Sequence, residues 1–571
     1  MFEISEKSAL EVKTLADTED RLMSMAQLSH AQRRRLRSAI RSIGKLLKRP
    51  LSMIPADAQT LREDLRRCHS IQAGISRKRL ANIKSELATV LQLLKVTESP
   101  RFADQPSTEW MSFLGQAPHN HQRWGLSRLA RYCTYHGLQP TDVTDQTMIE
   151  FRDHLQEFLL TSDPEKIRLN TAINFNVVLK SAGVNRPHLS ASKGSAYVTR
   201  PLSIYPHELQ EDLERYIKRL QNPHLFDPDS LDRPLRPVTI RNINAHIRQV
   251  LDAAVTAGYS PDDFRSLADV ISIEVVQAAF SEISRRLDCD VPPTLLNISA
   301  TLLAIARHYA NAPAETIRQL ERAKAKISSR LETRYRGMAA KNIIRLQPFN
   351  DAGNVRRLVS LPHHLMSEAR KSTGKKRAAL TAMISAAIAI LLACPMRMRN
   401  LAMLNVDRHL VFHSSQGRRL ISIHIPPEEV KNRQPVAVDL GPDFSGIVET
   451  YIGMFRSALT SEPSDALFPS RLGTARPPDK LGELIQHRIW RETGLTMNPH
   501  LFRHFAATIF LQEHPGEYES VRRLVGHAKM DTTVKFYALV SNSAAFQRYH
   551  QVLHVTEKRR SRQGGYGGRG A

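Results

Sequence analysis

The stretch LVGHAKMDTTVKFYALV, residues 524–540, places a histidine and a tyrosine ten residues apart. His527 directly follows a glycine, and Tyr537 lies behind Asp-Thr-Thr, which is typical of a helix start. An imidazole can move a proton, and a tyrosine hydroxyl can act as a nucleophile once a base removes its proton. This spacing therefore raises a catalytic hypothesis that depends on the rest of the chain.

Three further stretches carry residues suited to chemistry on an anion. In NPHLFRHFAATIF, His500 and Arg503 are three residues apart and so share one face of a helix. In CPMRMRNLAML, Arg397 follows a long apolar segment, which we expect to be a buried helix. In VKNRQPVAVDL, Lys431 falls in a predicted turn between two strands, and Lys480 in PPDKLGE is the alternative lysine. Each stretch alone is typical of ordinary structural or surface residues.

The order of these stretches resembles the catalytic domain of the tyrosine recombinases, the phage integrase family. CPMRMRNLAML resembles the family's first arginine box, HLFRHFAAT its second box, and LVGHAKMDTTVKFYA the box that ends in the tyrosine. The likeness covers residues 340–555. Two positions depart from the family pattern, because Pro395 stands where glycine is usual and Asn400 where an acidic residue is usual.

The resemblance implies that three of these residues bind the phosphate of a DNA strand. Negative charge grows on the non-bridging oxygens of a phosphodiester during displacement. Two guanidiniums can hold such oxygens by charge-assisted, bidentate bonds, which is the role expected of Arg397 and Arg503. His527 would donate a further hydrogen bond to the same phosphate.

The other three residues would carry out the displacement itself. Tyr537 would be the nucleophile, His500 the base that activates it, and Lys431 the acid that protonates the leaving 5′-oxygen. The product would be a 3′-phosphotyrosyl enzyme, which a second strand's hydroxyl then resolves. The resemblance therefore implies no cofactor and no metal.

The composition agrees with a polyanionic partner. The chain holds 81 Lys and Arg against 56 Asp and Glu, a net charge of +25, which favours nucleic acid. The four cysteines are far apart and form no CxxC pair, so a disulfide framework or zinc knuckle is not expected. We expect a cytoplasmic, nucleoid-associated protein of bacterial type. The apolar run from Leu380 to Met396 is short for a membrane span and predicts a core helix.

The pattern along the chain predicts a mainly α protein of several domains, with a small antiparallel β-sheet in the C-terminal catalytic domain. Two stretches repeat one layout, in which a helix ends at a glycine and a proline-aspartate turn leads to another helix. The expected parts are a basic helical N-terminal region at 1–105, a helical core-binding-like domain at 106–200, a helical core-binding (SAM-like) DNA-binding domain at 203–335, the catalytic domain at 340–555, and a disordered Gly/Arg-rich tail at 556–571. As the resemblance implies, the helical domain at 203–330 and the catalytic domain would form a clamp around duplex DNA.

The N-terminal region contains HAQRRRLRSAIRSIGKLLKRP, with Arg33, Arg34, Arg37 and Arg41 at helical spacing. These arginines predict either a helix that follows DNA phosphates or a solvated helix face.

The function favoured by the sequence is a site-specific DNA recombinase or integrase of a mobile element. A non-catalytic DNA-binding accessory protein on the same fold and a relaxing enzyme similar to type IB topoisomerases are the alternatives. Double-stranded DNA is the expected partner, with a homotetramer on two synapsed sites and a helix at 542–555 packing on a neighbouring subunit. Other recombinases or accessory DNA-bending proteins are possible further partners, and no membrane is expected.

Overall fold

A computed structural model describes residues 12–537, together with Tyr549 and Leu553. The undescribed positions within that range are 98–100, 161, 185, 192–198, 225, 227–230, 335–337, 416 and 535. The expected tail at 556–571, and all but those two residues of the expected helix at 542–555, lie outside the described residues. Two compact units make up the chain, one formed by Met1–Ala196 with Gln347–Ala506 and the other by Tyr197–Leu346 with Ala507–Ala571.

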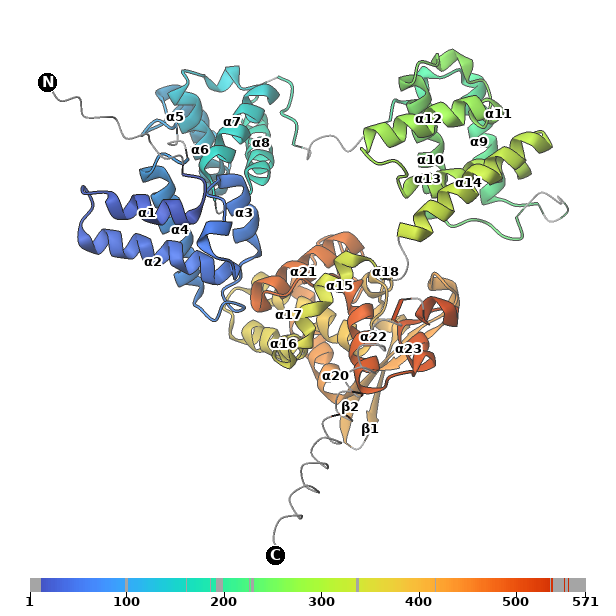
Figure 1. Cartoon of the computed structure of the whole chain (residues 1–571). Coiled ribbons are helices and arrows are strands. Elements are labelled where there is room, and N and C mark those ends of the chain that lie inside the picture. The colour runs from blue at the N-terminus through green and yellow to red at the C-terminus, as the bar shows by residue number, and fades with distance from the viewer. Residues whose placement is uncertain are drawn as a thin grey trace, which may run out of the picture. The chain divides into compact units, whose positions relative to one another are not determined.

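The first unit begins with a bundle of four helices (Figure 1). They are α1 Leu15–Ser24, α2 His30–Leu47, α3 Ala58–Arg67 and α4 Arg77–Leu93, with a short η1 at Leu51–Met53. Side chains of Thr14, Ser29, Asp57 and Ser76 accept hydrogen bonds from backbone N–H groups of the first turns of these helices. Leucine and isoleucine side chains from all four helices form one buried core.

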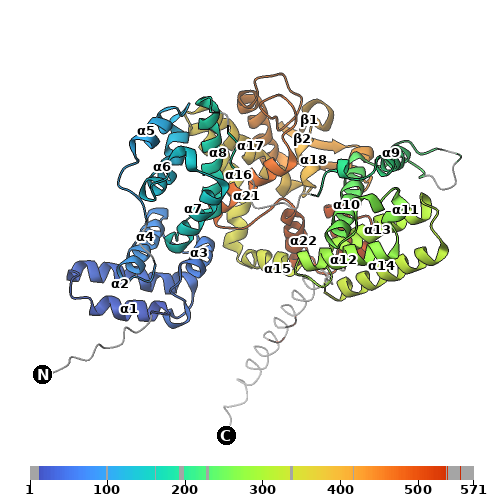
Figure 2. The ribbon, with the colours of Figure 1, turned by 90° about the horizontal axis from the view of Figure 1, so that it is seen from above.

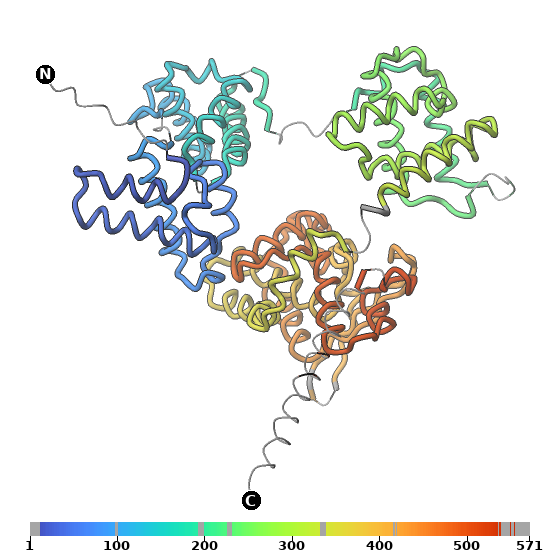
Figure 3. Tube along the Cα trace, in the orientation of Figure 1, coloured from blue at the N-terminus to red at the C-terminus, as the bar shows by residue number. Residues whose placement is uncertain are grey.

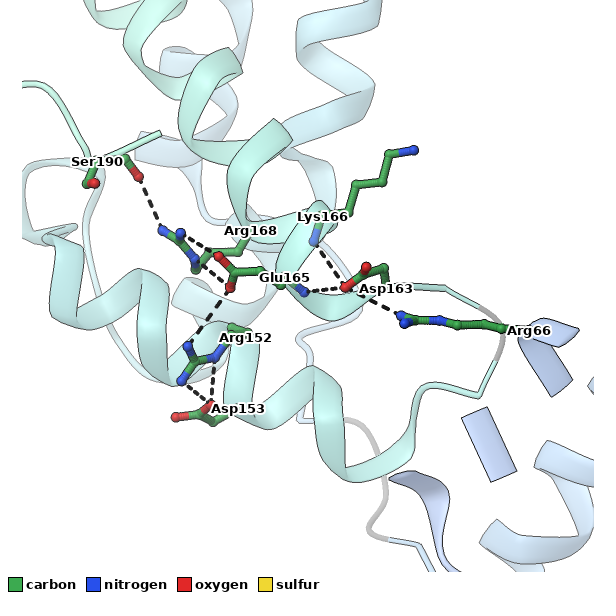
Figure 4. A network of polar contacts seen from close by, with 8 residues as sticks. All are labelled: Arg66, Arg152, Asp153, Asp163, Glu165, Lys166, Arg168 and Ser190. Atoms are coloured by element: carbon green, nitrogen blue, oxygen red, sulfur yellow. Dashed lines mark hydrogen bonds and ion pairs between the residues drawn. The ribbon is translucent and has the colours of Figure 1, made fainter. Parts of the chain in front are cut away.

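A second helical group follows in the same unit. It holds α5 Thr108–Gly115, α6 Asn120–Tyr135, η2 Pro140–Asp142, α7 Asp145–Phe158 and α8 Pro164–Ser181 around a core that includes fully buried Trp110, Phe151 and Phe175. Figure 4 shows the polar network at the start of α8, where Arg168 binds Glu165 and Asp163 caps the helix. Arg66 of α3 reaches Asp163 at 3.4 Å, so the bundle and this group are joined by an ion pair.

The part of the first unit that follows Leu346 is built around α17, Lys375–Ala393, which is buried along most of its length. The elements that pack on α17 are α16 Ala352–Lys371, α18 Met398–Ala402, α20 Gly441–Thr450, η7 Tyr451–Phe455, η8 Arg456–Leu459 and α21 Pro478–Thr493. The short η5, Gln347–Asn350, packs on α16, and α19, Val406–His409, packs on the sheet. Among the described residues α17 is the one helix long and apolar enough to cross a membrane, and 72% of its most apolar window is buried inside the protein. Such burial is typical of the core helix that the sequence predicts.

A three-stranded antiparallel sheet accompanies these helices, in the order β1 Leu410–Ser415, β2 Arg418–Ile425 and β3 Val436–Asp439. Figure 2 labels β1 and β2. Ile423 of β2 pairs with Leu410 on one side and with Val438 on the other. The short η6, Pro427–Glu429, leads from β2 toward β3. The mainly α fold with a small antiparallel sheet near the C-terminus is therefore confirmed.

The second unit holds another helical group, traced in Figure 3. Its elements are η3 Leu202–Ile204, α9 His207–Gln221, α10 Pro237–Thr256, η4 Pro261–Asp263, α11 Leu267–Val270, α12 Ile273–Arg286, α13 Thr294–His308, α14 Ala314–Arg334 and α15 Ala340–Leu346. The layout seen twice in the sequence is present: α6 ends at Gly137 (φ 71°) before η2, and α10 ends at Gly258 (φ 115°) before η4. In the C-terminal part of this unit, α23 spans Tyr518–Val525, and α22, Leu501–Glu513, contains the division between the units.

Candidate active site

Arg397 lies where the buried helix α17 ends. Cys394 caps that helix, Pro395 cannot continue it, and Arg397 is the N-cap of α18. The Arg397 guanidinium donates from Nη1 to Oδ1 of Asn432 at 3.2 Å. Burial lowers the pKa of Arg397 from its ordinary value, but a guanidinium stays charged at any physiological pH. The side chain is therefore a half-buried cation held in place by an amide.

Arg503 approaches the same chain segment from α22. It is 7% exposed, and its Nη1 donates to the Pro395 carbonyl at 3.0 Å. Since α22 starts at Leu501, Arg503 stands in its first turn, and Asn498 caps that turn by accepting from the Leu501 N–H at 2.8 Å. Arg503 is thus bound to a carbonyl that lies two residues before Arg397 in the chain.

His500 precedes α22 and is exposed, with its ring centroid 5.2 Å from that of His504. Burial of part of the ring, and then the positive charges of Arg503 and Arg397, lower the pKa of His500. A lowered pKa keeps the imidazole neutral near physiological pH, and a neutral imidazole can accept a proton. The structure therefore groups His500 with both arginines.

Lys431 is exposed in the turn between β2 and β3. That turn closes with a hydrogen bond from the Arg433 N–H to the Val430 carbonyl at 3.0 Å, and Arg433 adopts a left-handed conformation, φ 54°. Asn432, the next residue, carries the amide that binds Arg397. Lys431 therefore directly precedes the residue whose amide binds Arg397.

The alternative lysine has a different environment. Lys480 stands in the first turn of α21 and forms an ion pair with Glu483 at 3.2 Å. The helix α21 packs on α18, whose N-cap is Arg397, so Lys480 also belongs to an element near that arginine. Lys431 adjoins the Asn432 amide that binds Arg397, and its choice over Lys480 stays a prediction.

In the second unit, His527 follows Gly526, whose left-handed backbone (φ 58°) ends α23. Its N–H donates to the Arg522 carbonyl at 2.9 Å, and Arg522 donates back to the His527 carbonyl at 3.0 Å. The ring nitrogen Nδ1 lies 3.0 Å from the buried Thr533 hydroxyl, which fixes the orientation of the imidazole. Thr533 therefore acts on the ring as a positioning residue.

Tyr537 lies on the helical residues that begin at Met530. Its ring is stacked at 13° to that of His527, with 6.4 Å between centroids. The side chain is fully buried. The structure thus places the histidine and tyrosine of the opening stretch next to each other, and withdraws the tyrosine from solvent.

The sequence reasoning missed three contacts in these groups, namely Asn432 to Arg397, Thr533 to His527, and the Pro395 carbonyl to Arg503. Thr533 belongs to the Asp-Thr-Thr helix start and could have been found there. Asn432 and Arg397 are 35 residues apart in the chain, and no pattern signals their pairing. No group of three or more His, Cys, Asp or Glu side chains suited to a metal ion occurs among the described residues.

Most of the α2 arginines that were predicted to contact phosphates have hydrogen-bond partners within the protein. Arg37 and Arg41 both donate from Nε to Oε1 of Glu19, at 2.6 and 2.8 Å. Arg33 donates to the carbonyls of Met25 and Leu28 at 2.9 and 3.1 Å. Arg34 is exposed. Three of the four arginines therefore bind the protein itself, and their contact with DNA stays a prediction.

No curated protein matches. A structure of XerA recombinase aligns over 60% of this chain and 98% of its own, with 14% identity and a TM-score of 0.24. The XerH recombinase on a palindromic difH substrate aligns over 55% and 96%, with 14% identity and a TM-score of 0.29. A lambda integrase dimer bound to a COC′ core site aligns over 57% and 93%, with 13% identity and a TM-score of 0.30.

These identities and TM-scores are too low for the activity of the solved recombinases to be transferred to this chain. The family comparison is more specific. Residues 363–543 match the phage integrase family, and this range contains Arg397, Lys431, Arg503, His527 and Tyr537 as well as His500. The resemblance to tyrosine recombinases is therefore confirmed, and the family match covers residues 363–543.

Proposed function

We infer that the protein is a site-specific DNA recombinase or integrase that cleaves and rejoins duplex DNA through a 3′-phosphotyrosyl intermediate. The observation that carries this proposal is the arrangement at the end of α17, where Arg503 binds the Pro395 carbonyl and Arg397 binds Asn432. Two fixed guanidiniums beside a histidine of lowered pKa suit the stabilisation of a phosphorane-like transition state.

In the first step the Tyr537 oxygen attacks the phosphorus of the scissile phosphodiester. A bond forms between that oxygen and phosphorus, and the bond from phosphorus to the 5′-oxygen breaks. The phenolic proton passes to the neutral His500, and Lys431 supplies a proton to the departing 5′-oxygen. Arg397, Arg503 and His527 hold the non-bridging oxygens throughout.

The second step is the reverse reaction with a different strand. A free 5′-hydroxyl attacks the phosphorus of the phosphotyrosyl link and gives its proton to Lys431. The bond from phosphorus to the Tyr537 oxygen breaks, and that oxygen takes back the proton held by His500. Because the bond energy is conserved in the phosphotyrosine, the exchange needs no nucleotide hydrolysis. Neither step requires a group outside the six side chains and the DNA.

The buried state of Tyr537 has a consequence for the reaction order. Tyr537 is fully buried in the structure, so we propose that the helical residues that begin at Met530 move before cleavage. DNA binding would cause this movement. The Tyr537 hydroxyl would therefore stay shielded from solvent until a substrate is bound.

The proposed strand exchange also implies the partners of the protein. Strand exchange between two duplexes needs four active sites, hence a homotetramer on two synapsed sites of double-stranded DNA. Other recombinases or DNA-bending proteins can assist synapsis, and the enzyme would integrate or excise a mobile element at the bacterial nucleoid, in the cytoplasm. The helical groups at 106–200 and 203–335 are proposed to hold the duplex.

A trapping experiment tests the function. Nicked duplexes, including fragments from the DNA that flanks the gene, lose a short strand after cleavage and so trap the covalent enzyme. The proposal predicts a protein–DNA adduct that survives denaturation, and recombination between two copies of the cleaved sequence. DNA binding without any adduct would indicate an accessory protein, and relaxation without recombination would indicate a topoisomerase-like enzyme.

A further inference from the structure

An open cavity of about 810 Å³ lies in the N-terminal bundle, far in sequence from the phage integrase domain. It is bounded by the end of α2, the end of α3 and the start of α4. The charged side chains that line it are Lys45, Lys48, Arg49, Asp64, Arg67 and Arg79. Five cations and one carboxylate therefore face a single space.

The carboxylate is already used within the cavity. Asp64 forms an ion pair with Arg49. In the part of the chain that the structure describes, no ion pair with a carboxylate involves Lys45, Lys48, Arg67 or Arg79. His69 also lines the cavity, and burial lowers its pKa, so it adds no full charge near neutral pH. Four positive charges thus have no carboxylate partner among the described residues.

The backbone at the start of α4 makes this charge costly. The first turn of α4 holds Arg77, Lys78 and Arg79 and no acidic residue. A helix N-terminus carries the positive end of the helix dipole, so carboxylates are favoured there and cations are not. Arg77 finds a partner in Glu492, at 3.1 Å, whereas Arg79 turns to the cavity. A bound anion would relieve this repulsion.

The end of α2 also places a cation at the cavity, at a position where the backbone is strained. Lys48 adopts a left-handed backbone, φ 54°, at the helix C-cap, a conformation that glycine adopts more readily. A lysine at this position places a cation in the cavity.

Part of the excess positive charge of the chain lies in this region. Residues 1–97 hold 19 Lys and Arg against 10 Asp and Glu, whereas residues 98–196 hold 10 of each. If the whole surface were uniformly basic, these two neighbouring segments would carry a similar net charge.

We propose that this cavity is a phosphate-binding site, formed by Lys45, Lys48, Arg67 and Arg79. Guanidinium forks match the oxygens of a phosphate, and several converging cations suit a group with at least two charged or partly charged oxygens. The phosphate comes either from the DNA backbone or from a free phosphate compound. The site lies outside the domain to which cleavage is assigned, so it does not depend on the proposed function.

The variant Lys48→Gly with Arg79→Gln tests the site in the full chain. It removes two cavity charges at positions where the backbone is expected to tolerate or prefer the change. The matched control is Lys95→Gly with Lys78→Gln. Lys95 is also left-handed, φ 55°, and Lys78 stands in the same first turn as Arg79, but neither lines the cavity. Both variants remove two charges from similar backbone settings.

Two measurements separate the sources of the phosphate. In the first, inorganic phosphate or pyrophosphate is added at constant ionic strength and Tm is followed. A free-phosphate site predicts a rise in Tm for the wild type and the control, and the loss of at least about half of that rise in the cavity variant. In the second, affinity for a DNA duplex is measured between roughly 50 and 200 mM salt. Loss of one backbone contact lowers the slope of log K against log salt by about 0.9, so the affinity lost over that range becomes about 3.5-fold smaller.

A reduced slope in the cavity variant but not in the control identifies the DNA backbone as the source. Because both measurements report binding alone, they give the same answer whether or not the protein cleaves DNA. If the cavity variant and its control behave alike in both measurements, the cavity is not a phosphate site.

Discussion

Arg503 of α22 and the Pro395 carbonyl at the end of α17 are joined by a hydrogen bond of 3.0 Å inside the protein. The contact bridges 108 residues of chain. It fixes a guanidinium beside Arg397, and it satisfies a carbonyl that the broken helix leaves without a helical partner. One contact therefore serves both the fold and the proposed chemistry.

Arg503→Lys separates these two roles. A lysine keeps the charge but lacks the planar fork, so it cannot bind the carbonyl and two phosphate oxygens at once. We expect cleavage to fall by about 10²–10³-fold, as for the loss of one transition-state donor. Unfolding free energy should fall by about 1–3 kcal/mol through the poorly satisfied carbonyl. Single-turnover cleavage and thermal unfolding measure the two effects, and unchanged cleavage would remove Arg503 from the site.

The lowered pKa of His500 predicts the pH dependence of cleavage. Burial first, and then the charges of Arg503 and Arg397, disfavour the imidazolium. The base is neutral, and therefore active, above its folded pKa, so cleavage should persist below the ordinary histidine pKa of about 6.5 and fall only at lower pH. In Arg397→Gln, one source of that shift is removed, and the acidic limb should move to higher pH. A limb that stays at the same pH in both proteins would argue against His500 as the base.

Lys431 is tested by the chemistry of the leaving group. An alkoxide leaves poorly without a proton, so Lys431→Ala should slow cleavage of ordinary DNA by about 10²–10⁴-fold. A thiolate leaves readily, so the variant should regain activity on DNA with sulfur at the scissile 5′-bridging position. The matched control is Lys480→Ala, because Lys480 is paired with Glu483. This variant should cleave both substrates as the wild type does. Sulfur rescue of Lys480→Ala alone would transfer the acid role to Lys480.

The arginines of α2 give a prediction about stability. Burial tends to raise the pKa of Glu19, but hydrogen bonds from Arg37 and Arg41 outweigh it and hold that pKa below its ordinary value. Replacing both arginines with alanine leaves a buried carboxylate without partners and should cost about 1–2 kcal/mol. The loss should be largest above the ordinary glutamate pKa and shrink as pH falls through the lowered value, because protonation of Glu19 removes the charge.

Arg34→Ala is the control for that pair, because Arg34 is exposed on the same helix. It should leave Tm nearly unchanged. If Arg37 and Arg41 instead contact DNA phosphates, their double variant should lower the salt dependence of DNA affinity by about one unit of slope per lost contact. Denaturation curves and binding isotherms of the two variants distinguish these outcomes.

The sequence predicted those features that depend on local pattern. The apolar run of α17 and the turn that carries Lys431 follow from periodicity and from breaker residues, as does the repeated layout ending at Gly137 and Gly258. The strand β1, Leu410–Ser415, was not predicted, because LVFHSS gains its order from pairing with β2. The pairing of Arg37 and Arg41 with Glu19 and the burial of Tyr537 also arise from contacts that only the folded chain creates.

The central claim is that Tyr537 becomes covalently joined to DNA. Tyr537→Phe removes one hydroxyl and should preserve folding and DNA affinity, whereas Tyr518→Phe, a change on α23, serves as the control. On nicked duplexes that trap the intermediate, the wild type and Tyr518→Phe should form a denaturation-resistant adduct, and peptide mapping should find the nucleotide on the peptide with Tyr537. Tyr537→Phe should form none. An adduct formed by Tyr537→Phe, or a nucleotide mapped to another tyrosine, would contradict the account.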